Sequence, residues 1–210
     1  MSEYLVSPYQ HSLEKRMLDV SFAGSIGLIA LTAGAMTAAG IAVSERMSPF
    51  FVQRRQGRGG TDFSVLKLRT MRKDGSLIRG GKAIRSSGVD ETPQFLNILN
   101  GNMSVVGYRP LLTEDINHAA NRLKAHYTES SPYHPNRWLT LRDQCNPGIT
   151  GPSQTMQLRE DAGSLTHLAD VIAQECAYME QGTFATDLRF IVQTPGTLQH
   201  GHNLTVTRAS

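Results

Sequence analysis

The stretch from Val20 to Ser44, VSFAGSIGLIALTAGAMTAAGIAVS, contains no charged residue, whereas the rest of the chain is polar. As a helix it would be about 37 Å long at roughly 1.5 Å per residue, which is enough to enter or cross a bilayer. Glycines and alanines make it only weakly hydrophobic, so a buried helix of a soluble domain is the alternative. A cleaved signal peptide is disfavoured, because its apolar region is typically only about 7–15 residues long. We therefore predict a membrane-inserted helix over residues 15–46.

Basic residues flank both ends of this predicted helix. They are Lys15 and Arg16 before the uncharged stretch, and Arg46, Arg54, Arg55 and Arg58 after it. Because Lys and Arg tend to stay on the cytoplasmic side, we expect both ends of the helix to be cytoplasmic. A re-entrant helix, which enters the membrane and turns back, meets this requirement, whereas a straight crossing does not. We expect its bend near Gly34, where the hydroxyls of Thr32 and Thr37 can donate to freed carbonyls.

The composition allows one domain with a sizeable core and suits an anionic ligand. In 210 residues, 21 Lys and Arg stand against 18 Asp and Glu, which gives a net charge of +3. This excess fits an anionic ligand or membrane surface but is too weak to predict nucleic-acid binding, and the sequence has no zinc-finger, RNP or basic-zipper motif. Cys145 and Cys176 lack the spacing of a metal site or disulfide framework, so we expect two free core thiols.

The residues after the apolar stretch predict a small β-hairpin followed by polar segments. Apolar and β-branched runs at 50–52 and 63–68 flank a glycine-rich turn at 57–60, as expected for two paired strands. The polar, glycine-rich segment 72–89 is predicted to be a loop. The charged segment 114–143 has no clear periodicity and is also predicted to be irregular.

Helical spacing of apolar residues appears elsewhere and makes the predicted fold a mainly helical α+β class. A helix is expected from Asp90 to Leu99, and another from 165 to 179 with Ser164 as its N-cap. A further apolar stretch over 184–192 is expected to end at Pro195. The predicted division is a polar lead-in over 1–14, the membrane helix over 15–46, a cytoplasmic helical catalytic domain over 47–195 and a C-terminal tail over 196–210.

Two adjacent acids, Asp90 and Glu91, open the predicted helix in GVDETPQFLNIL. The simple interpretation is helix capping, with Asp90 as N-cap, Glu91 at the first helical position and Pro93 in the first turn. Neighbouring side chains on a helix do not point the same way, so the two carboxylates can serve different partners. One could attack an electrophile while the other holds a cation. A carboxylate that forms an acyl-phosphate is established chemistry, and a helix N-terminus is itself a phosphate site.

Basic residues near the two acids suggest an anionic ligand with several charges. Lys67 and Arg69 project from the same face of the predicted strand, and Arg85 and Arg109 could complete a ring around phosphate oxygens. A solvated strand face is the alternative for the first pair. A diphosphate would suit such a ring and would usually bring a divalent cation, most often Mg²⁺, to the carboxylates.

Several motifs resemble, in order, the bacterial sugar transferase family, which comprises monotopic phosphoglycosyl transferases. They are KRMLDV at the start of the apolar helix, FVQRRQGRGGTDFSVLKLRTM, VDETPQFLNILNGNMSVVGYRP, NPGITG and TDLRFIVQT. The resemblance extends from Lys15 to about Thr194, nearly the whole chain, and its central block is the most specific part.

The resemblance implies transfer of a sugar phosphate from a nucleotide (UDP-) sugar to a polyprenol phosphate, through a covalent aspartyl-phosphosugar. This reaction initiates polysaccharide or glycoconjugate assembly at the cytoplasmic face of the inner membrane. By matching position, Asp90 would be the nucleophile and Glu91 its partner, and both would hold Mg²⁺. The matching substrate-binding residues would be Lys67, Arg69, Arg85, Arg109 and Asp187. The expected partners are the nucleotide sugar, the polyprenol phosphate and the membrane, with no nucleic acid; a homo-oligomer is left open.

The sequence departs from the family pattern at several points. The apolar helix lacks the usual Ser-Pro pair, Tyr108 stands where proline is usual, and Pro152 replaces a usual tryptophan. The departures after Pro110 affect the region expected to contact the sugar, so the resemblance does not predict which sugar is used. They also motivate two alternatives: a catalytically idle homologue that binds polyprenol or nucleotide as an assembly partner, and a soluble anion-binding domain.

Overall fold

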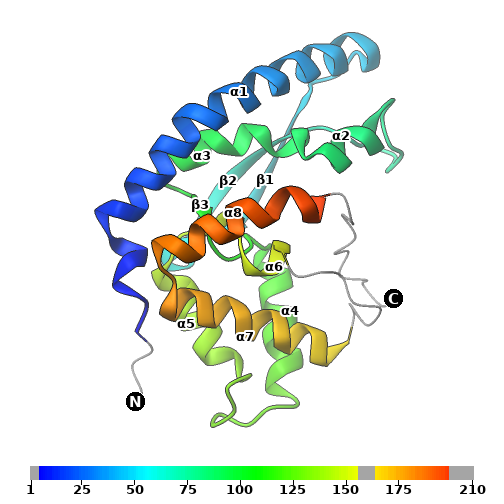
Figure 1. The fold of residues 1–210 in the computed structure, drawn as a ribbon. Helices are drawn as coiled ribbons and strands as arrows, with labels where there is room; N and C mark the ends of the chain where they lie inside the picture. The colour runs from blue at the N-terminus through cyan, green and yellow to red at the C-terminus, as the bar shows by residue number, and fades with distance from the viewer. Residues whose placement is uncertain (1–4, 156–163, 199–210) are drawn as a thin grey trace.

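The computed structural model describes residues 5–155 and 164–198, and it is a mainly helical α+β fold. Figure 1 shows a long helix, α1 (Leu13–Glu45), along one side, with α4 (Thr113–Lys124), α5 (Pro135–Gln144) and α7 (Leu165–Gln181) on the opposite side. The remaining elements lie mostly between them. They are η1 (Pro8–His11), β1 (Phe50–Gln56), η2 (Arg58–Gly60), β2 (Asp62–Leu68), α2 (Gly81–Ser87), η3 (Val89–Gln94), α3 (Phe95–Leu99), β3 (Ser104–Val106), β4 (Gly148–Thr150), α6 (Pro152–Thr155) and α8 (Phe184–Leu198).

Helix α1 is the one helix among residues 5–155 and 164–198 that is long and apolar enough to cross a membrane. The Ser12 hydroxyl accepts from the Lys15 N–H at its start, and the left-handed Arg46 ends it. Its large outward side chains are exposed apolar residues such as Ile29, Met36 and Val43. The outer face of α1 therefore has the chemistry of a lipid-facing surface.

Two glycines let α1 lie directly against the elements that follow the hairpin. A Cβ on Gly27 would lie 2.8 Å from Cδ1 of Phe95 in α3, and one on Gly34 would overlap Oγ1 of Thr92 in η3. The helix is continuous through Gly34 and curves gradually in Figure 1. The bend expected near Gly34 is therefore not a local break in the helix, and Gly34 is a close-packing position. The hydroxyl of Thr32 donates to carbonyls of the preceding turn.

The N-terminal half of α1 is attached to the domain by buried charges. Lys15 Nζ lies 2.6 Å from Asp187 Oδ2, and these two side chains are 5% and 0% exposed. Asp19 accepts from the Ser104 hydroxyl and from the Val105 N–H. Lys15 therefore lies inside the core and is not the exposed flanking charge that the sequence suggested. Helix α1 begins at Leu13, so Lys15 belongs to its first turn, and the buried partners of Lys15 come from distant parts of the chain.

The C-terminal end of α1 is attached to the same domain. Glu45 pairs with the Arg72 guanidinium at 2.7 Å and accepts from the Arg79 N–H at 3.0 Å. One turn earlier, Ile41 packs with Leu68 and other buried apolar residues in a small core of its own. Both ends of the long helix are thus held on one folded unit.

The predicted hairpin is confirmed. β1 and β2 pair antiparallel, with Phe50 opposite Leu68 and Gln56 opposite Asp62. The predicted loop over 72–89 is partly wrong, since it contains α2. The predicted irregular segment 114–143 is wrong at both ends, since it forms α4 and α5 around a loop. The buried residues of α4 are Ile116, Ala119, Ala120 and Leu123, which have helical spacing, so the sequence did contain a signal for this helix.

The C-terminal helices follow the sequence pattern more closely. The Ser164 hydroxyl accepts from the His167 N–H and caps α7, as predicted. Helix α8 continues to Leu198, so its expected end at Pro195 is wrong. Of the predicted tail, residues 199–210 lie outside the described residues. Cys145 and Cys176 are free and buried, as expected, and burial raises the pKa of each thiol to about 12.

The contact between Gly34 and Thr92 predicts different effects for two Gly→Ala substitutions in one helix. Gly34→Ala should lower the free energy of unfolding by about 1–3 kcal/mol, because Thr92 must move and lose its bond to the Val89 carbonyl. Gly24 has nothing within 4 Å of its Cβ position, so Gly24→Ala should be neutral or stabilise by up to about 1 kcal/mol. Thermal unfolding followed by circular dichroism in mild detergent measures both. Equal melting temperatures would contradict the close contact.

Candidate active site

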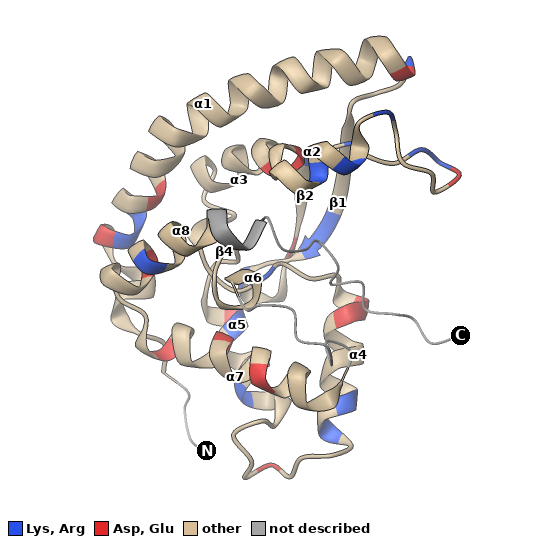
Figure 2. Cartoon of the chain, turned by 45° about the vertical axis from the view of Figure 1, so that its right-hand side comes forward, with Lys and Arg blue, Asp and Glu red and all other residues tan. Residues whose placement is uncertain are grey.

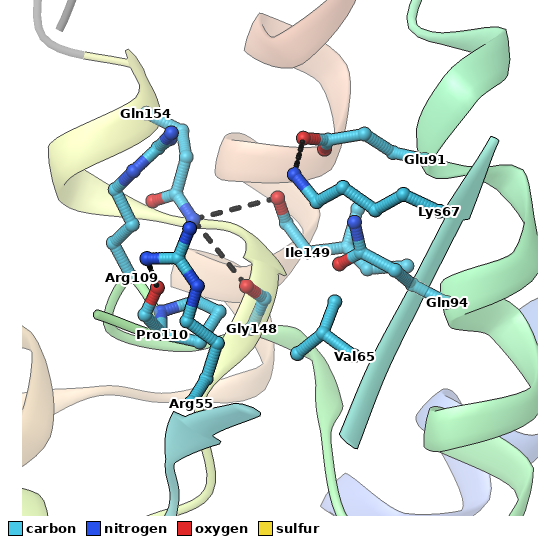
Figure 3. Close-up of a pocket in the computed structure, with 10 residues that line it drawn as sticks. All are labelled: Arg55, Val65, Lys67, Glu91, Gln94, Arg109, Pro110, Gly148, Ile149 and Gln154. Atoms are coloured by element: carbon cyan, nitrogen blue, oxygen red, sulfur yellow. Dashed lines mark hydrogen bonds and ion pairs between the residues drawn. The ribbon is translucent and has the colours of Figure 1, made fainter. Parts of the chain in front are cut away.

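A narrow pocket lies where the hairpin meets η3, the chain after β3 and the β4–α6 corner (Figure 3). Its lining residues are Arg55, Val65, Lys67, Glu91, Gln94, Arg109, Pro110, Gly148, Ile149 and Gln154. Three of them are cationic and one is anionic, so the pocket carries a positive charge. The lining residues are spread along the sequence from Arg55 to Gln154, so only the tertiary fold brings them together.

Lys67 and Glu91 form one wall of the pocket. Lys67 Nζ lies 2.7 Å from Glu91 Oε1, and both side chains are about one quarter exposed, at 23% and 26%. Lys67 projects from β2 and Glu91 from η3, so their contact joins the hairpin to the short helix. A partly exposed ion pair of this kind can rearrange when a multivalent anion binds, because the ammonium can contact carboxylate and phosphate together.

Two guanidinium groups form the opposite wall. Burial lowers the pKa of Arg55, and the positive charge of Arg109 lowers it further. Arg55 is held in place by Gln53 Oε1, which accepts from its Nε and Nη2, and by the Pro110 carbonyl. Two nearby cations that repel each other are better stabilised by an anion with oxygens for both, and guanidiniums match phosphate geometry.

Close backbone contact between two glycine-containing motifs places Arg109. The Gly107 N–H donates to the Thr150 carbonyl, and the Gly148 N–H donates to the Tyr108 carbonyl, at 2.9 Å each. A Cβ on Gly107 would lie 2.6 Å from the Asn146 carbonyl oxygen, so GYRP and NPGITG can meet only with glycine at this contact. Arg109 leaves this contact directly toward the pocket.

Polar groups behind Arg109 support its backbone. The Arg109 N–H donates to Glu175 Oε1 at 3.0 Å, and the Trp138 indole N–H donates to Glu175 Oε2 at 2.8 Å. The Arg142 guanidinium lies 4.0 Å from the centre of the Tyr108 ring. On the pocket side, the Gln154 amide donates toward two backbone carbonyls of β4, as Figure 3 shows.

The adjacent acids belong to a 3₁₀ turn and not to the start of an α-helix. Gly88, with a left-handed φ of 72°, is the N-cap of η3, so the predicted N-cap role of Asp90 is wrong. Glu91 lines the pocket, whereas Asp90 is 9% exposed and is absent from the pocket lining. The two side chains therefore diverge, in keeping with the sequence argument that neighbours on a helix serve different partners.

Only two of the other five predicted site residues line the pocket. Lys67 and Arg109 line the pocket, but Arg69, Arg85 and Asp187 do not. Arg69 follows the last residue of β2, and its guanidinium lies against the Phe51 ring and donates to the carbonyls of Ser48 and Phe50. Arg85 Nη1 lies 3.8 Å from the Met71 sulfur. Asp187 is fully buried and accepts from Lys15. Their roles toward a ligand stay predictions.

Three polar pocket residues were missed from the sequence: Arg55, Gln94 and Gln154. The alternation of side chains in the predicted hairpin could have identified Arg55. In the antiparallel register Arg55 stands opposite Phe63, and Phe51 stands opposite Lys67. Directly opposite residues share a face, and alternate residues of a strand do too, so Arg55 and Lys67 lie on one face. Gln94 and Gln154 had no such signal, because their positions depend on how short helices pack.

The chain is similar to known proteins over most of its length. The profile of a family described as Bacterial sugar transferase matches residues 10–201. A UDP-glucose:undecaprenyl-phosphate glucose-1-phosphate transferase of Caulobacter vibrioides is 32% identical over 201 residues, covering 89% of this chain and 70% of that protein. A protein with the same description from Xanthomonas campestris pv. campestris is 32% identical over 171 residues, covering 75% of this chain. A galactosyl transferase of Streptococcus agalactiae is 27% identical over 210 residues, covering 89% of this chain.

The chain spans 33% and 42% of the length of the Xanthomonas and Streptococcus proteins. These relatives therefore contain further sequence with no counterpart in the alignment. Their names also refer to different sugars, glucose in two cases and galactose in one.

The pocket geometry predicts unequal effects for two arginines that the sequence treated alike. Arg109→Ala should weaken UDP binding by about 2–5 kcal/mol if its guanidinium contacts a desolvated phosphate. Arg85→Ala should change it by less than about 0.5 kcal/mol, because Arg85 is outside the pocket. Calorimetric titration with UDP measures both, and circular dichroism checks that each variant is folded. Similar losses in the two variants would show that this pocket is not the phosphate site.

Proposed function

The chain belongs to the bacterial sugar transferase family, and from this we propose that it transfers a sugar phosphate from a UDP-sugar to a polyprenol phosphate. The observation that carries the proposal is the cationic pocket beside the adjacent acids, on a domain that also holds a long apolar helix. Such an arrangement suits a reaction between a charged soluble donor and a lipid-linked acceptor.

The donor diphosphate would occupy the pocket. Arg55 and Arg109 can bind its oxygens from one wall, and Lys67 from the other. Mg²⁺ usually takes one or two carboxylates together with water and substrate phosphates; Glu91, which lines the pocket, can supply one, and Asp90, its neighbour in η3, can supply a second when its side chain turns toward the ligand. No group of three or more His, Cys, Asp or Glu side chains able to hold a metal occurs among residues 5–155 and 164–198. When bound, the ion would neutralise charge on the diphosphate.

Asp90 would act as the nucleophile. Its carboxylate oxygen would attack the phosphorus that bears the sugar, and the bond from that phosphorus to the bridging oxygen would break, with release of UMP. A phosphate oxygen of the polyprenol phosphate would then attack the same phosphorus, which forms the polyprenyl diphosphate sugar and restores the Asp90 carboxylate. The low exposure of Asp90 supports this role, because water that reached the acyl-phosphate would hydrolyse it.

The attachment of α1 supports a monotopic arrangement with the domain at the cytoplasmic face of the membrane. Lys15 joins one end of α1 to the domain, and Glu45 joins the other end to it. A helix that crossed the bilayer would have to separate its ends across about 30 Å of hydrocarbon. The helix is therefore proposed to enter the membrane with its exposed apolar face and to leave on the same side, as a re-entrant segment does.

The nucleophile assignment predicts the loss of a covalent adduct. Asp90→Asn should abolish UMP release and also the protein adduct with the mass of a sugar phosphate. Glu91→Gln should slow both strongly but leave some adduct, because its carboxylate assists and does not form the bond. Glu129→Gln, in an exposed loop, is the control and should behave as the wild type. Mass spectrometry of the intact protein after incubation with a UDP-sugar measures the adduct, and wild-type turnover by Asp90→Asn would disprove the mechanism.

A screen of UDP-sugars with polyprenol phosphate tests the reaction itself. The wild-type chain should release UMP with at least one donor. Repeated turnover should require polyprenol phosphate, which regenerates the Asp90 carboxylate. Nucleotide binding without UMP release from any donor would instead support the idle homologue, for which the departures at Tyr108 and Pro152 give a reason.

The topology has its own test. His11→Cys and Arg58→Cys place single exposed thiols before and after α1, while the native Cys145 and Cys176 are buried and should label slowly. With a membrane-impermeant thiol reagent, both new cysteines should be shielded in intact cells and label after lysis. The wild-type chain gives the background. Labelling of residue 11 from outside, with residue 58 shielded, would show that α1 spans the membrane.

A further inference from the structure

A second hollow lies near the C-terminal end of α1. It has a volume of about 470 Å³ and shares no lining residue with the pocket around Lys67 and Glu91. Its lining residues are Met47, Ser48, Arg69, Arg72, Lys73 and Asp74. Nothing in the proposed reaction uses it.

Among the residues that the structure describes, two of the three cations at this hollow have no acidic partner. The Arg72 guanidinium is paired with Glu45, with Nη2 and Oε2 2.7 Å apart. Arg69 donates to two backbone carbonyls, which hold its direction but do not neutralise its charge. Lys73 is exposed and forms no hydrogen bond or ion pair within residues 5–155 and 164–198. The hollow can therefore accept an anion without losing an existing ion pair.

The surrounding chain is strongly basic. Residues 45–85 contain eleven Lys and Arg, more than half of the 21 in the chain, but only three of its 18 Asp and Glu. Of these three acids, Glu45 is paired with Arg72, and Asp74 accepts from the Ser76 hydroxyl at 2.7 Å. Figure 2 shows basic residues on the strands and loops that lie below this end of α1. The mild net charge of the whole chain conceals this local concentration.

Exposed apolar side chains lie next to the same cations. Phe51 is exposed and its ring centre is 5.9 Å from the Arg69 guanidinium carbon. Arg72 Nη1 donates to the carbonyl of the exposed Leu77 at 2.9 Å. Val43, near the end of α1, is 80% exposed. Cations beside exposed aromatic and aliphatic side chains match the boundary between lipid head groups and acyl chains.

We propose that this hollow binds the phosphate head group of an anionic phospholipid, whose acyl chains lie along the exposed apolar face at the end of α1. Arg69 and Lys73 would contact the phosphate, and Arg72 would remain paired with Glu45. The proposal rests on the membrane association in the proposed function but not on the transfer reaction. It would hold the C-terminal end of α1 at the membrane surface by a lipid contact, in addition to hydrophobic insertion.

The test uses a short-chain lipid so that insertion of α1 does not obscure the contact. The full chain in neutral detergent is titrated calorimetrically with dihexanoyl-phosphatidylglycerol. Lys73→Glu should weaken binding by about tenfold, since it replaces an attractive charge with a repulsive one. Lys124→Glu, at the exposed end of α4, should bind as the wild type. Dihexanoyl-phosphatidylcholine, which carries no net charge, should bind much more weakly to all three proteins.

Three outcomes would overturn the proposal. They are equal phosphatidylglycerol binding by wild type and Lys73→Glu, equally tight binding of inorganic phosphate alone, and one-for-one displacement of phosphatidylglycerol by polyprenol phosphate. The last result would assign the hollow to the acceptor substrate. UMP release measured on the same samples keeps the two proposals distinct, because Lys73→Glu should retain turnover. A wild-type protein that bound the lipid but released no UMP would contradict the proposed function alone.

Discussion

The buried ion pair between Lys15 and Asp187 determines how α1 lies on the rest of the protein. Two charges without water are costly, so the pair is stabilised only because further groups satisfy them. Lys15 also donates to the Val106 carbonyl, and the hydroxyls of Tyr9 and Tyr178 donate to Asp187. Burial, and then the charge of Asp187, raises the pKa of both tyrosines, which keeps their hydroxyls protonated as donors. Removing one partner would leave an uncompensated buried charge.

This attachment brings the apolar helix and the candidate active site together. From its clamped N-terminal end, α1 runs over α3 and η3, where Gly27 and Gly34 leave room for Phe95 and Thr92. Asp90 and Glu91 belong to the same short helix as Thr92. The glycines that dilute the hydrophobicity of α1 therefore place its inner face against the element that carries the two acids. The apolar helix and the cationic pocket are therefore connected through η3, which packs on α1 and supplies Glu91 to the pocket.

Local patterns explain which parts of the fold could be predicted. The hairpin and α7 were correct because alternation, helical spacing and an N-cap serine are properties of neighbouring residues. Helix α4 was missed although Ile116, Ala119, Ala120 and Leu123 have helical spacing, because the prediction rested on the charged composition of the segment and not on this spacing. The N-cap role of Asp90 was wrong because Gly88 takes the N-cap position of a tighter 3₁₀ turn that begins at Val89. Of the expected phosphate-binding residues, Arg69 is absent from the pocket lining because its guanidinium is bonded to the carbonyls of Ser48 and Phe50.

The sequence by itself determined the long uncharged helix, the adjacent acids, the basic strand beside them and, through its ordered motifs, the family. Each depends on composition, on spacing or on a run of residues that can be read in order. Only the tertiary structure decided that Lys15 is buried against Asp187, that Arg55 and Arg109 share one pocket wall, and that Arg69 belongs to a second hollow. These placements depend on packing between distant segments, where burial and partner charges, and not residue type, decide what a side chain contacts.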